Sequence, residues 1–312
     1  MPAPLIRAFG ASCDATGNNF DALDRSLARI EAAGATCAEI ALFSCDSIVS
    51  GRVNRAVVRQ LEAICGRRNL HYTVHGPLVS NFFDVKRTAM TMAVQKASVD
   101  ITAALGTDVM VMRQGVLADE PDEATLTELL AAERDALIEL GDYAAANGVT
   151  IAVENVMRYL PTIGYCAPPD RLAAHLSSIA HPNVRCTLEV GHAYLSAEQL
   201  GRTHLECMRP LGEHIVHIHC QDQYGRSPTM KTYTHHEAVA FGIGDLHLPM
   251  GWGDIDFDGL LLQLGLQPGI TMFYELNPIQ DAWLEQTLDR LGDLVDRLNA
   301  AASANAGEPH AH

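Results

Sequence analysis

Positive charge is scarce in this sequence of 312 residues. The chain has 22 lysines and arginines against 38 aspartates and glutamates, which gives a formal net charge of −16 at pH 7. A protein that binds a phosphate backbone needs clustered basic side chains, and no basic stripe runs through this chain. The composition therefore argues against nucleic acid as a partner, and a bound cation would offset part of the excess acid.

Long hydrophobic runs are also missing. No apolar stretch reaches the roughly 18 residues that span a bilayer, and the opening MPAPLIRAFGAS lacks the basic segment and apolar core of a signal peptide. The eight cysteines are scattered without a CxxC pair, and several lie in apolar runs like reduced core residues. We therefore expect a cytoplasmic protein that makes no membrane contact.

Short β-rich runs alternate with longer helical patterns along the chain. The clearest helical pattern covers 122–147, where apolar residues recur at three- and four-residue steps before Gly148. The predicted strands are 5–12, 37–43, 71–75, 108–113, 150–155, 184–190, 214–219 and 270–275. The predicted helices are 19–33, 53–68, 85–105, 122–147, 168–180, 196–209, 256–265 and 280–301. Strand followed by helix, eight times over, predicts an α/β fold, a single (β/α)8 TIM barrel.

An open, doubly wound sheet is the alternative fold. Such a sheet usually has a glycine-rich GxGxxG turn after its first strand, and GASCDATGNN at 10–19 is not one. We expect one domain over 1–301 and a flexible, small and polar tail over 302–312. The connection 221–245 is long, polar and glycine-containing, and we interpret it as a candidate lid, because connections of that size are usually functional.

The segment HIVHIHCQD at 214–222 places histidines inside an apolar run. A strand has a period of two, so His217 and His219 share one face. Buried imidazoles need hydrogen-bond partners or a metal ion, because an unpaired buried polar group costs about 1–3 kcal/mol.

Polar residues also close six of the predicted strands, at the end where barrels carry their active sites: His75, Arg113, Glu154, Glu189, His219 and Glu275. Taken singly, each is more often a solvated or packed side chain. Together, three converging carboxylates would raise one another's pKa unless a cation lay among them. Glu154, Glu189, His219 and Glu275 form an oxygen-rich ligand set that suits Mn²⁺, Mg²⁺ or Co²⁺ and tolerates Zn²⁺. We therefore predict one divalent metal ion held by these four residues.

The same residues lie in motifs that resemble those of the xylose-isomerase-like TIM barrels. The motifs are HGPLVSN (75–81), VENV with Glu154, LEVGH with Glu189 and His192, HIH with His219, DLHLPMGWGDIDF with His247, and YELNP with Glu275. That superfamily contains sugar and sugar phosphate isomerases and epimerases, endonuclease IV and related dehydratases. The resemblance, which covers about the third to the eighth strand, implies that the four predicted ligands bind metal and that His192 contacts substrate. Position 189 is usually Asp there, so Glu189 is a departure.

Our leading hypothesis is a metal-dependent sugar or polyol isomerase or epimerase that abstracts a proton next to a carbonyl through a metal-stabilised enediolate. Glu154 and Glu275 would remove and return the proton from opposite sides of the substrate. The expected substrate-binding residues are His75, Arg113, His192 and His247. If the intermediate expels a β-hydroxyl group instead, the same residues make a lyase or dehydratase.

Two further hypotheses stay open at this stage. An endonuclease IV-like zinc phosphodiesterase would hold three zinc ions, with ligands matching His75, His192, Asp245 and His247, but Arg113 stands where that branch has a histidine, and the net charge of −16 is unfavourable. A non-catalytic sugar-binding barrel is the other, because fold does not determine function. The expected partner is a small sugar or polyol, and a homo-oligomer is compatible with the sequence.

Overall fold

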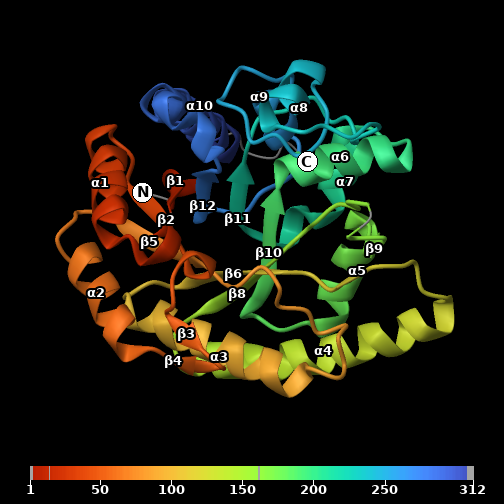
Figure 1. Ribbon diagram of the computed structural model, residues 1–312. Helices are drawn as coiled ribbons and strands as arrows, with labels where there is room; N and C mark the ends of the chain where they lie inside the picture. The colour runs from red at the N-terminus through yellow and green to blue at the C-terminus, as the bar shows by residue number, and fades with distance from the viewer. Residues whose placement is uncertain (1–2, 14, 161, 308–312) are drawn as a thin grey trace.

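The computed structural model describes residues 3–13, 15–160 and 162–307. Eight parallel strands close into a barrel with the helices around it (Figure 1). In order around the barrel they are β1 (Ile6–Cys13), β2 (Cys37–Ala41), β5 (His71–His75), β6 (Val109–Arg113), β8 (Thr150–Glu154), β10 (Val184–Glu189), β11 (Ile215–Cys220) and β12 (Ile270–Tyr274), which pairs with β1. The predicted (β/α)8 TIM barrel is therefore confirmed.

The register of neighbouring strands brings polar residues together at the carboxyl ends. Arg113 on β6 pairs with Glu154 on β8, and Glu189 on β10 pairs with His219 on β11. Residues that are paired across parallel strands point to the same face of the sheet. Each pair therefore presents its two side chains to the same region of the barrel.

Helices surround the barrel, and most of them pack an apolar side against it. Their bounds are α1 (Phe20–Ala32), α2 (Arg55–Cys65), α3 (Thr88–Ala104), α4 (Glu123–Ala146), α5 (Pro169–Ile179), α6 (Val190–Leu200), α7 (His204–Met208), α8 (His235–Phe241), α9 (Phe257–Leu261) and α10 (Leu284–Gly307). In α1, Asn19 caps the first turn, and Leu23, Leu27 and Ile30 are buried at helical spacing. This spacing gives the helix one apolar side to pack on the sheet, and the main hydrophobic core includes all three leucine and isoleucine side chains.

Smaller elements lie in the connections. They are the hairpin of β3 (Ile48–Val49) and β4 (Arg52–Val53), the pair β7 (Val116–Leu117) and β9 (Tyr165–Cys166), and the 3-10 helices η1 (Thr16–Asn18), η2 (Leu42–Ser44), η3 (Arg209–His214) and η4 (Pro278–Trp283). The connection 221–245 contains α8, whose His235 is bound through both ring nitrogens, to Asn277 and to Gln280 of η4. These contacts attach α8 to the segment that follows β12.

The helix predicted over 196–209 is wrong in its start and in its continuity. The Glu189 side chain accepts a hydrogen bond from the Gly191 amide, so α6 begins at Val190, directly after β10. Gly201, at φ 63°, ends α6 in the left-handed conformation that glycine adopts readily. A capping box of Thr203 and Glu206 then starts α7.

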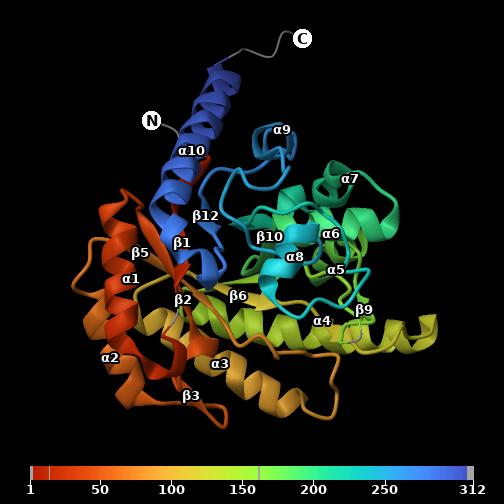
Figure 2. The same cartoon turned by 45° about the horizontal axis from the view of Figure 1, so that its top comes forward.

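The last helix, α10, lies along β1 and extends beyond the amino ends of the strands (Figure 2). The Asn299 side chain fixes it there through hydrogen bonds to the backbone N–H and C=O of Ile6. Of the tail expected to be flexible over 302–312, the part up to Gly307 is helical, and 308–312 lie outside the described residues. Within the described ranges, no helix is both long and apolar enough to cross a membrane.

Candidate metal centre and acid–base site

His219 lies at the centre of a group of buried side chains at the carboxyl end of the barrel. Its Nδ1 is 3.5 Å from Glu189 Oε2 and 3.4 Å from Glu275 Oε1. Ligand atoms of His75, His219 and Glu275 also lie within 4.8 Å of one another. Two of the other predicted metal ligands, Glu189 and Glu275, therefore lie within 3.5 Å of His219, and His75 forms a compact group with His219 and Glu275.

Two ligand atoms at this point are buried and have no hydrogen-bond partner among the described residues: His219 Nδ1 and Glu189 Oε2. Leaving such atoms unpaired costs about 1–3 kcal/mol each. A divalent cation between them would satisfy both, and one imidazole with carboxylates is a common donor set for such ions. The residues present therefore fit the expected metal ion, and the longer side chain of Glu189 reaches the site.

The charges of this group depend on one another. Burial raises the pKa of Glu189 to about 8, against the lowering effect of His192, and the nearby carboxylate of Glu275 adds to the rise. For His219, burial lowers the pKa, but the carboxylates of Glu39 and Glu275 outweigh it and raise the pKa well above its ordinary value. Burial and a neighbouring carboxylate both raise the pKa of a carboxyl group, and neighbouring carboxylates raise that of an imidazole because they stabilise its protonated form.

Glu154 is held by a different set of groups. Its carboxylate lies 3.3 Å from His75 Nε2, 3.2 Å from His192 Nδ1 and 3.6 Å from Arg113 Nε. Burial would raise the pKa of Glu154, but Arg113, His192 and His75 together hold it well below its ordinary value, so the carboxylate is ionised at neutral pH. Among the described residues, neither Glu154 nor Glu189 is in a group of three whose ligand atoms all lie within 4.8 Å of one another, but Glu189 is 3.5 Å from His219 Nδ1, whereas the contacts of Glu154 are to His75, His192 and Arg113.

A third cluster is formed by His192, Asp245 and His247. Asp245 Oδ2 lies 3.4 Å from His192 Nε2 and 3.2 Å from His247 Nε2, and ligand atoms of the three lie within 4.8 Å of one another. His247 Nδ1 is also 3.7 Å from Glu275 Oε2. His192 thus links Glu154 to Asp245, and His247 links Asp245 to Glu275, so two of the predicted substrate-binding histidines connect the surroundings of Glu154 to the metal centre.

The segment that carries this cluster is tied down by Asp222. Its side chain accepts hydrogen bonds from the backbone amides of Gly251, Gly253, Gln223 and Ile255. Asp222 and Leu248 also exchange backbone hydrogen bonds. His247 has a φ of 50°, a strained conformation for a histidine, which hydrogen bonds from its N–H to Gln221 and from Asn277 to its C=O support.

Glu39 is the site residue that the sequence reasoning missed. It lies on β2, is 1% exposed, and is 3.0 Å from His217 Nε2 and 3.1 Å from His219 Nε2. The other ring nitrogen of His217 is 2.6 Å from Thr271 Oγ1. The two histidines of HIVHIH therefore share a carboxylate. The available signal was Glu39 itself, an acidic residue in the middle of the apolar run CAEIALF.

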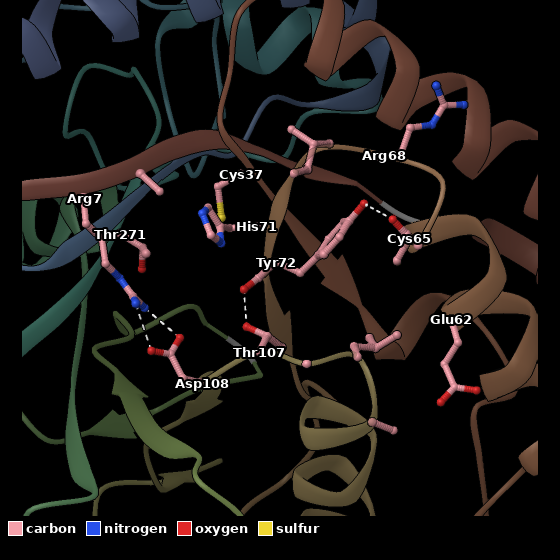
Figure 3. Close-up of a pocket in the computed structure, with 16 residues that line it drawn as sticks. Arg7, Cys37, Glu62, Cys65, Arg68, His71, Tyr72, Thr107, Asp108 and Thr271 are labelled. Atoms are coloured by element: carbon pink, nitrogen blue, oxygen red, sulfur yellow. Dashed lines mark hydrogen bonds and ion pairs between the residues drawn. The ribbon is translucent and has the colours of Figure 1, made fainter.

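A cavity of about 760 Å³ opens at the opposite end of the barrel, around Arg7, Cys37, His71 and Asp108 (Figure 3). Arg7 crosses it with two hydrogen bonds to Asp108, of 2.7 and 2.9 Å. Of the described residues that line the cavity, Thr271 contacts His217, but none is a carboxylate or histidine of the clusters above. Because barrel active sites lie at the carboxyl ends of the strands, we place the functional site at the polar clusters rather than at this cavity.

Comparison with known proteins agrees with the architecture. Residues 27–299 match the family model of the xylose isomerase-like TIM barrel. Among solved structures, a D-tagatose 3-epimerase-like protein is 20% identical, with a TM-score of 0.70 over 95% of this chain and 99% of that one. The D-allulose 3-epimerase from Methylomonas sp. in complex with D-allulose is 19% identical, with a TM-score of 0.62 over 98% and 97%.

The IOLI protein with a bound zinc atom is 16% identical, with a TM-score of 0.63 over 94% of this chain and 98% of that one. At such identities the similarity to these structures shows a shared fold. Among curated proteins, no sequence gives a significant match. The family model covers most of the chain, and the protein therefore belongs to the xylose isomerase-like TIM barrel family.

Proposed function

We propose that this protein is a divalent-metal-dependent sugar epimerase or isomerase that moves a proton on the carbon next to a carbonyl group. The observation that carries the proposal is the pair of buried, unpartnered ligand atoms, His219 Nδ1 and Glu189 Oε2, beside Glu275. An ionised carboxylate, Glu154, is held in the same mouth. Family membership and the epimerases among the similar structures support a sugar as substrate.

Glu189, His219 and Glu275 would hold the ion, and Glu154 would join them once substrate binding releases it from its present partners. When bound, a divalent cation supplies a Lewis acid that stabilises negative charge on neighbouring substrate oxygens and acidifies the adjacent C–H bond. Arg113 places a permanent positive charge 3.6 Å from Glu154, and this charge repels a second cation at that position. The arrangement thus favours one ion per chain.

Glu154 is the proposed base that removes the proton. Its surroundings keep it ionised, and the three groups that do so are also suited to bind substrate oxygens: Arg113, His75 and His192. A substrate oxygen that takes over one of these donors would weaken the hold on Glu154. The pKa of Glu154 would then rise toward the range in which a general base works best.

Glu275 is the proposed acid that returns the proton. It is part of the metal centre, yet its side chain is 20% exposed, whereas that of Glu189 is fully buried. His247 borders Glu275 and would bind the substrate from that side. Return of the proton to the same carbon from the opposite face inverts it, and return to the neighbouring carbon exchanges aldose and ketose. Loss of a β-hydroxyl group would make the enzyme a lyase or dehydratase.

A phosphodiesterase is the second candidate, and the cluster of His192, Asp245 and His247 favours it, because these three residues can hold another cation. Metal counting separates the candidates. Metal-free protein would be reloaded with Mn²⁺, Co²⁺, Mg²⁺ or Zn²⁺, counted by elemental analysis, and incubated with ketoses and with bis(p-nitrophenyl) phosphate.

One ion per chain with interconversion of ketoses would support the proposal. Two or three ions with hydrolysis of the phosphodiester would replace it by the nuclease-like function. Ketose binding with one ion and no turnover by any metal form would identify a non-catalytic sugar-binding barrel.

A further inference from the structure

We propose that Glu39 is a positioning residue that sets the tautomer of His219, so that Nε2 carries the proton and the lone pair of Nδ1 faces Glu189 and Glu275. The inference rests on the proposed metal centre, which it extends to a residue that contacts none of the reacting groups. Glu39 lies on β2, across the barrel interior from β11, and belongs to none of the sequence motifs that carry the predicted metal ligands.

The carboxylate of Glu39 is surrounded by hydrogen-bond donors. Oε1 lies 3.0 Å from Ser12 Oγ and 3.1 Å from His219 Nε2. Oε2 lies 3.1 Å from Thr73 Oγ1 and 3.0 Å from His217 Nε2. An ionised carboxylate only accepts hydrogen bonds, so both imidazoles must present an N–H to it through Nε2. All these groups are in the interior, where such charge-assisted bonds are strong.

The other nitrogen of each histidine then has a defined role. Since His217 donates through Nε2, its Nδ1 accepts from the Thr271 hydroxyl at 2.6 Å, and His217 is neutral. His219 Nδ1 has no such partner among the described residues and lies 3.4–3.5 Å from the Glu275 and Glu189 carboxylates. A metal ion binds the deprotonated nitrogen of an imidazole, and Nδ1 is the nitrogen left free for it.

A neighbouring carboxylate of this kind orients a ligand histidine and makes it more basic. Loss of such a partner typically costs about 10–100-fold in metal affinity. The rings are also fixed by packing, since His217 lies edge-on to His219 with centroids 4.8 Å apart, and His75 stacks on His219 at 5.8 Å. Packing holds the ring plane but does not distinguish its two nitrogens, so the tautomer depends on Glu39.

A competing interpretation makes Glu39 a ligand itself, because Glu39, His217 and His219 also have ligand atoms within 4.8 Å of one another. An ion there would have to replace both histidine hydrogen bonds to Glu39 and bind two deprotonated Nε2 atoms. The observed distances of 3.0 and 3.1 Å are those of direct hydrogen bonds. The structure therefore favours positioning over ligation at Glu39.

The test is Glu39→Gln. The amide keeps one acceptor oxygen, but its NH₂ group must face a donor, so one histidine has to exchange its tautomer. In Zn²⁺-loaded protein, ¹⁵N NMR of the histidine side chains should show the proton on Nε2 of His219 and the metal ion on Nδ1 in the wild type, and a mixture of the two arrangements in the variant. His219→Gln assigns the signal. The dissociation constant for Co²⁺, measured by calorimetry, should rise by about 10–100-fold, while binding remains one ion per chain.

Matched variants separate positioning from general destabilisation. Glu133 is another buried glutamate paired with a histidine, 3.1 Å from His175 Nε2 and bonded to the Gly115 amide, and Glu133→Gln should lower stability with Co²⁺ affinity unchanged. Glu39→Asp keeps an ionised acceptor and should retain the His219 tautomer, which keeps the test available if Glu39→Gln does not fold.

A folded Glu39→Gln protein with the wild-type tautomer and Co²⁺ affinity within twofold would overturn the proposal. Two ions in the wild type and one in the variant would do the same by making Glu39 a ligand. These measurements use no sugar, so a chain that binds Co²⁺ as expected but turns over no ketose would refute the proposed function and leave the role of Glu39 standing.

Discussion

Replacing Asp222 by Asn should loosen the segment that carries Asp245 and His247. In the native protein, Oδ2 accepts from the amides of Gly251 and Gly253 at 2.8 and 2.9 Å. Oδ1 accepts from those of Gln223 and Ile255 at 3.0 and 3.4 Å. Asn is the same size but has only one acceptor oxygen, so its NH₂ group would face two N–H donors.

Two backbone amides would then lose their acceptor. At about 1–3 kcal/mol for each buried unsatisfied group, and with water reaching part of this loop, we expect a loss of about 2–4 kcal/mol in the free energy of unfolding. Urea unfolding of Asp222→Asn and wild type measures it. Asp119→Asn, at an exposed position in another loop, is the control and should change stability by less than about 0.5 kcal/mol.

A loss of less than about 1 kcal/mol in Asp222→Asn would show that these four hydrogen bonds do not hold the segment. Sugar binding should also weaken in the variant, because His247, a proposed substrate-binding residue, lies in the segment that Asp222 holds in place. Unchanged sugar affinity in a clearly destabilised Asp222→Asn protein would show that these hydrogen bonds stabilise the segment but do not position His247 for substrate binding.

Three other variants probe individual side chains. Arg113→Lys should raise KM by roughly tenfold or more with the metal content unchanged, because one bidentate charged contact is worth ~1.5–3 kcal/mol; loss of metal, or an unchanged KM, would leave only the ion pair with Glu154. His219→Ala should lose the metal ion and with it the increase in melting temperature that metal gives to the wild type; retention of stoichiometric metal would remove His219 from the ligand set. Burial lowers the pKa of His204 to about 4, so between pH 4 and about pH 6.5 the unfolded chain binds a proton that the folded chain does not. The free energy of unfolding should therefore be constant above about pH 6.5 and should fall as the pH is lowered toward 4. Over that window wild type should lose up to about 3 kcal/mol relative to His204→Phe, which keeps the stacking on Tyr194; parallel pH profiles of the two proteins would contradict this.

The barrel could be predicted because each strand and helix has a local pattern. The predicted strand at 71–75 coincides with β5, and that at 150–155 differs from β8 by one residue, because both runs are short and contain β-branched or aromatic residues, which favour a strand. The region after β10 was predicted less well. The side chain of Glu189 both caps α6 and belongs to the metal centre, and a cap made by a strand's last residue has no distinct sequence signal. The capping box at Thr203 was visible and would have separated α7.

The site could be predicted only in part. Residues that end parallel strands meet at one end of a barrel, so Glu189, His219 and Glu275 follow from strand positions alone. Which carboxylate each histidine contacts depends on stagger across the barrel and on side-chain length, which no local pattern encodes. Glu39 is two residues before the end of its strand, and its role arises only when β2 faces β11 across the interior. For the same reason, the sequence did not predict that His75 and His192 contact the carboxylate of Glu154.

Solvent deuterium incorporation tests the central claim most directly. Metal-loaded protein would turn over a ketose in D₂O, and NMR would locate the label in recovered substrate and product. Proton transfer by Glu154 predicts deuterium on the carbon next to the carbonyl, because a carboxylate exchanges its proton with water. It also predicts that Glu154→Gln loses most of this exchange while it still binds metal and sugar, since an amide cannot carry the proton. Product formed without label, or full exchange in Glu154→Gln, would contradict the account.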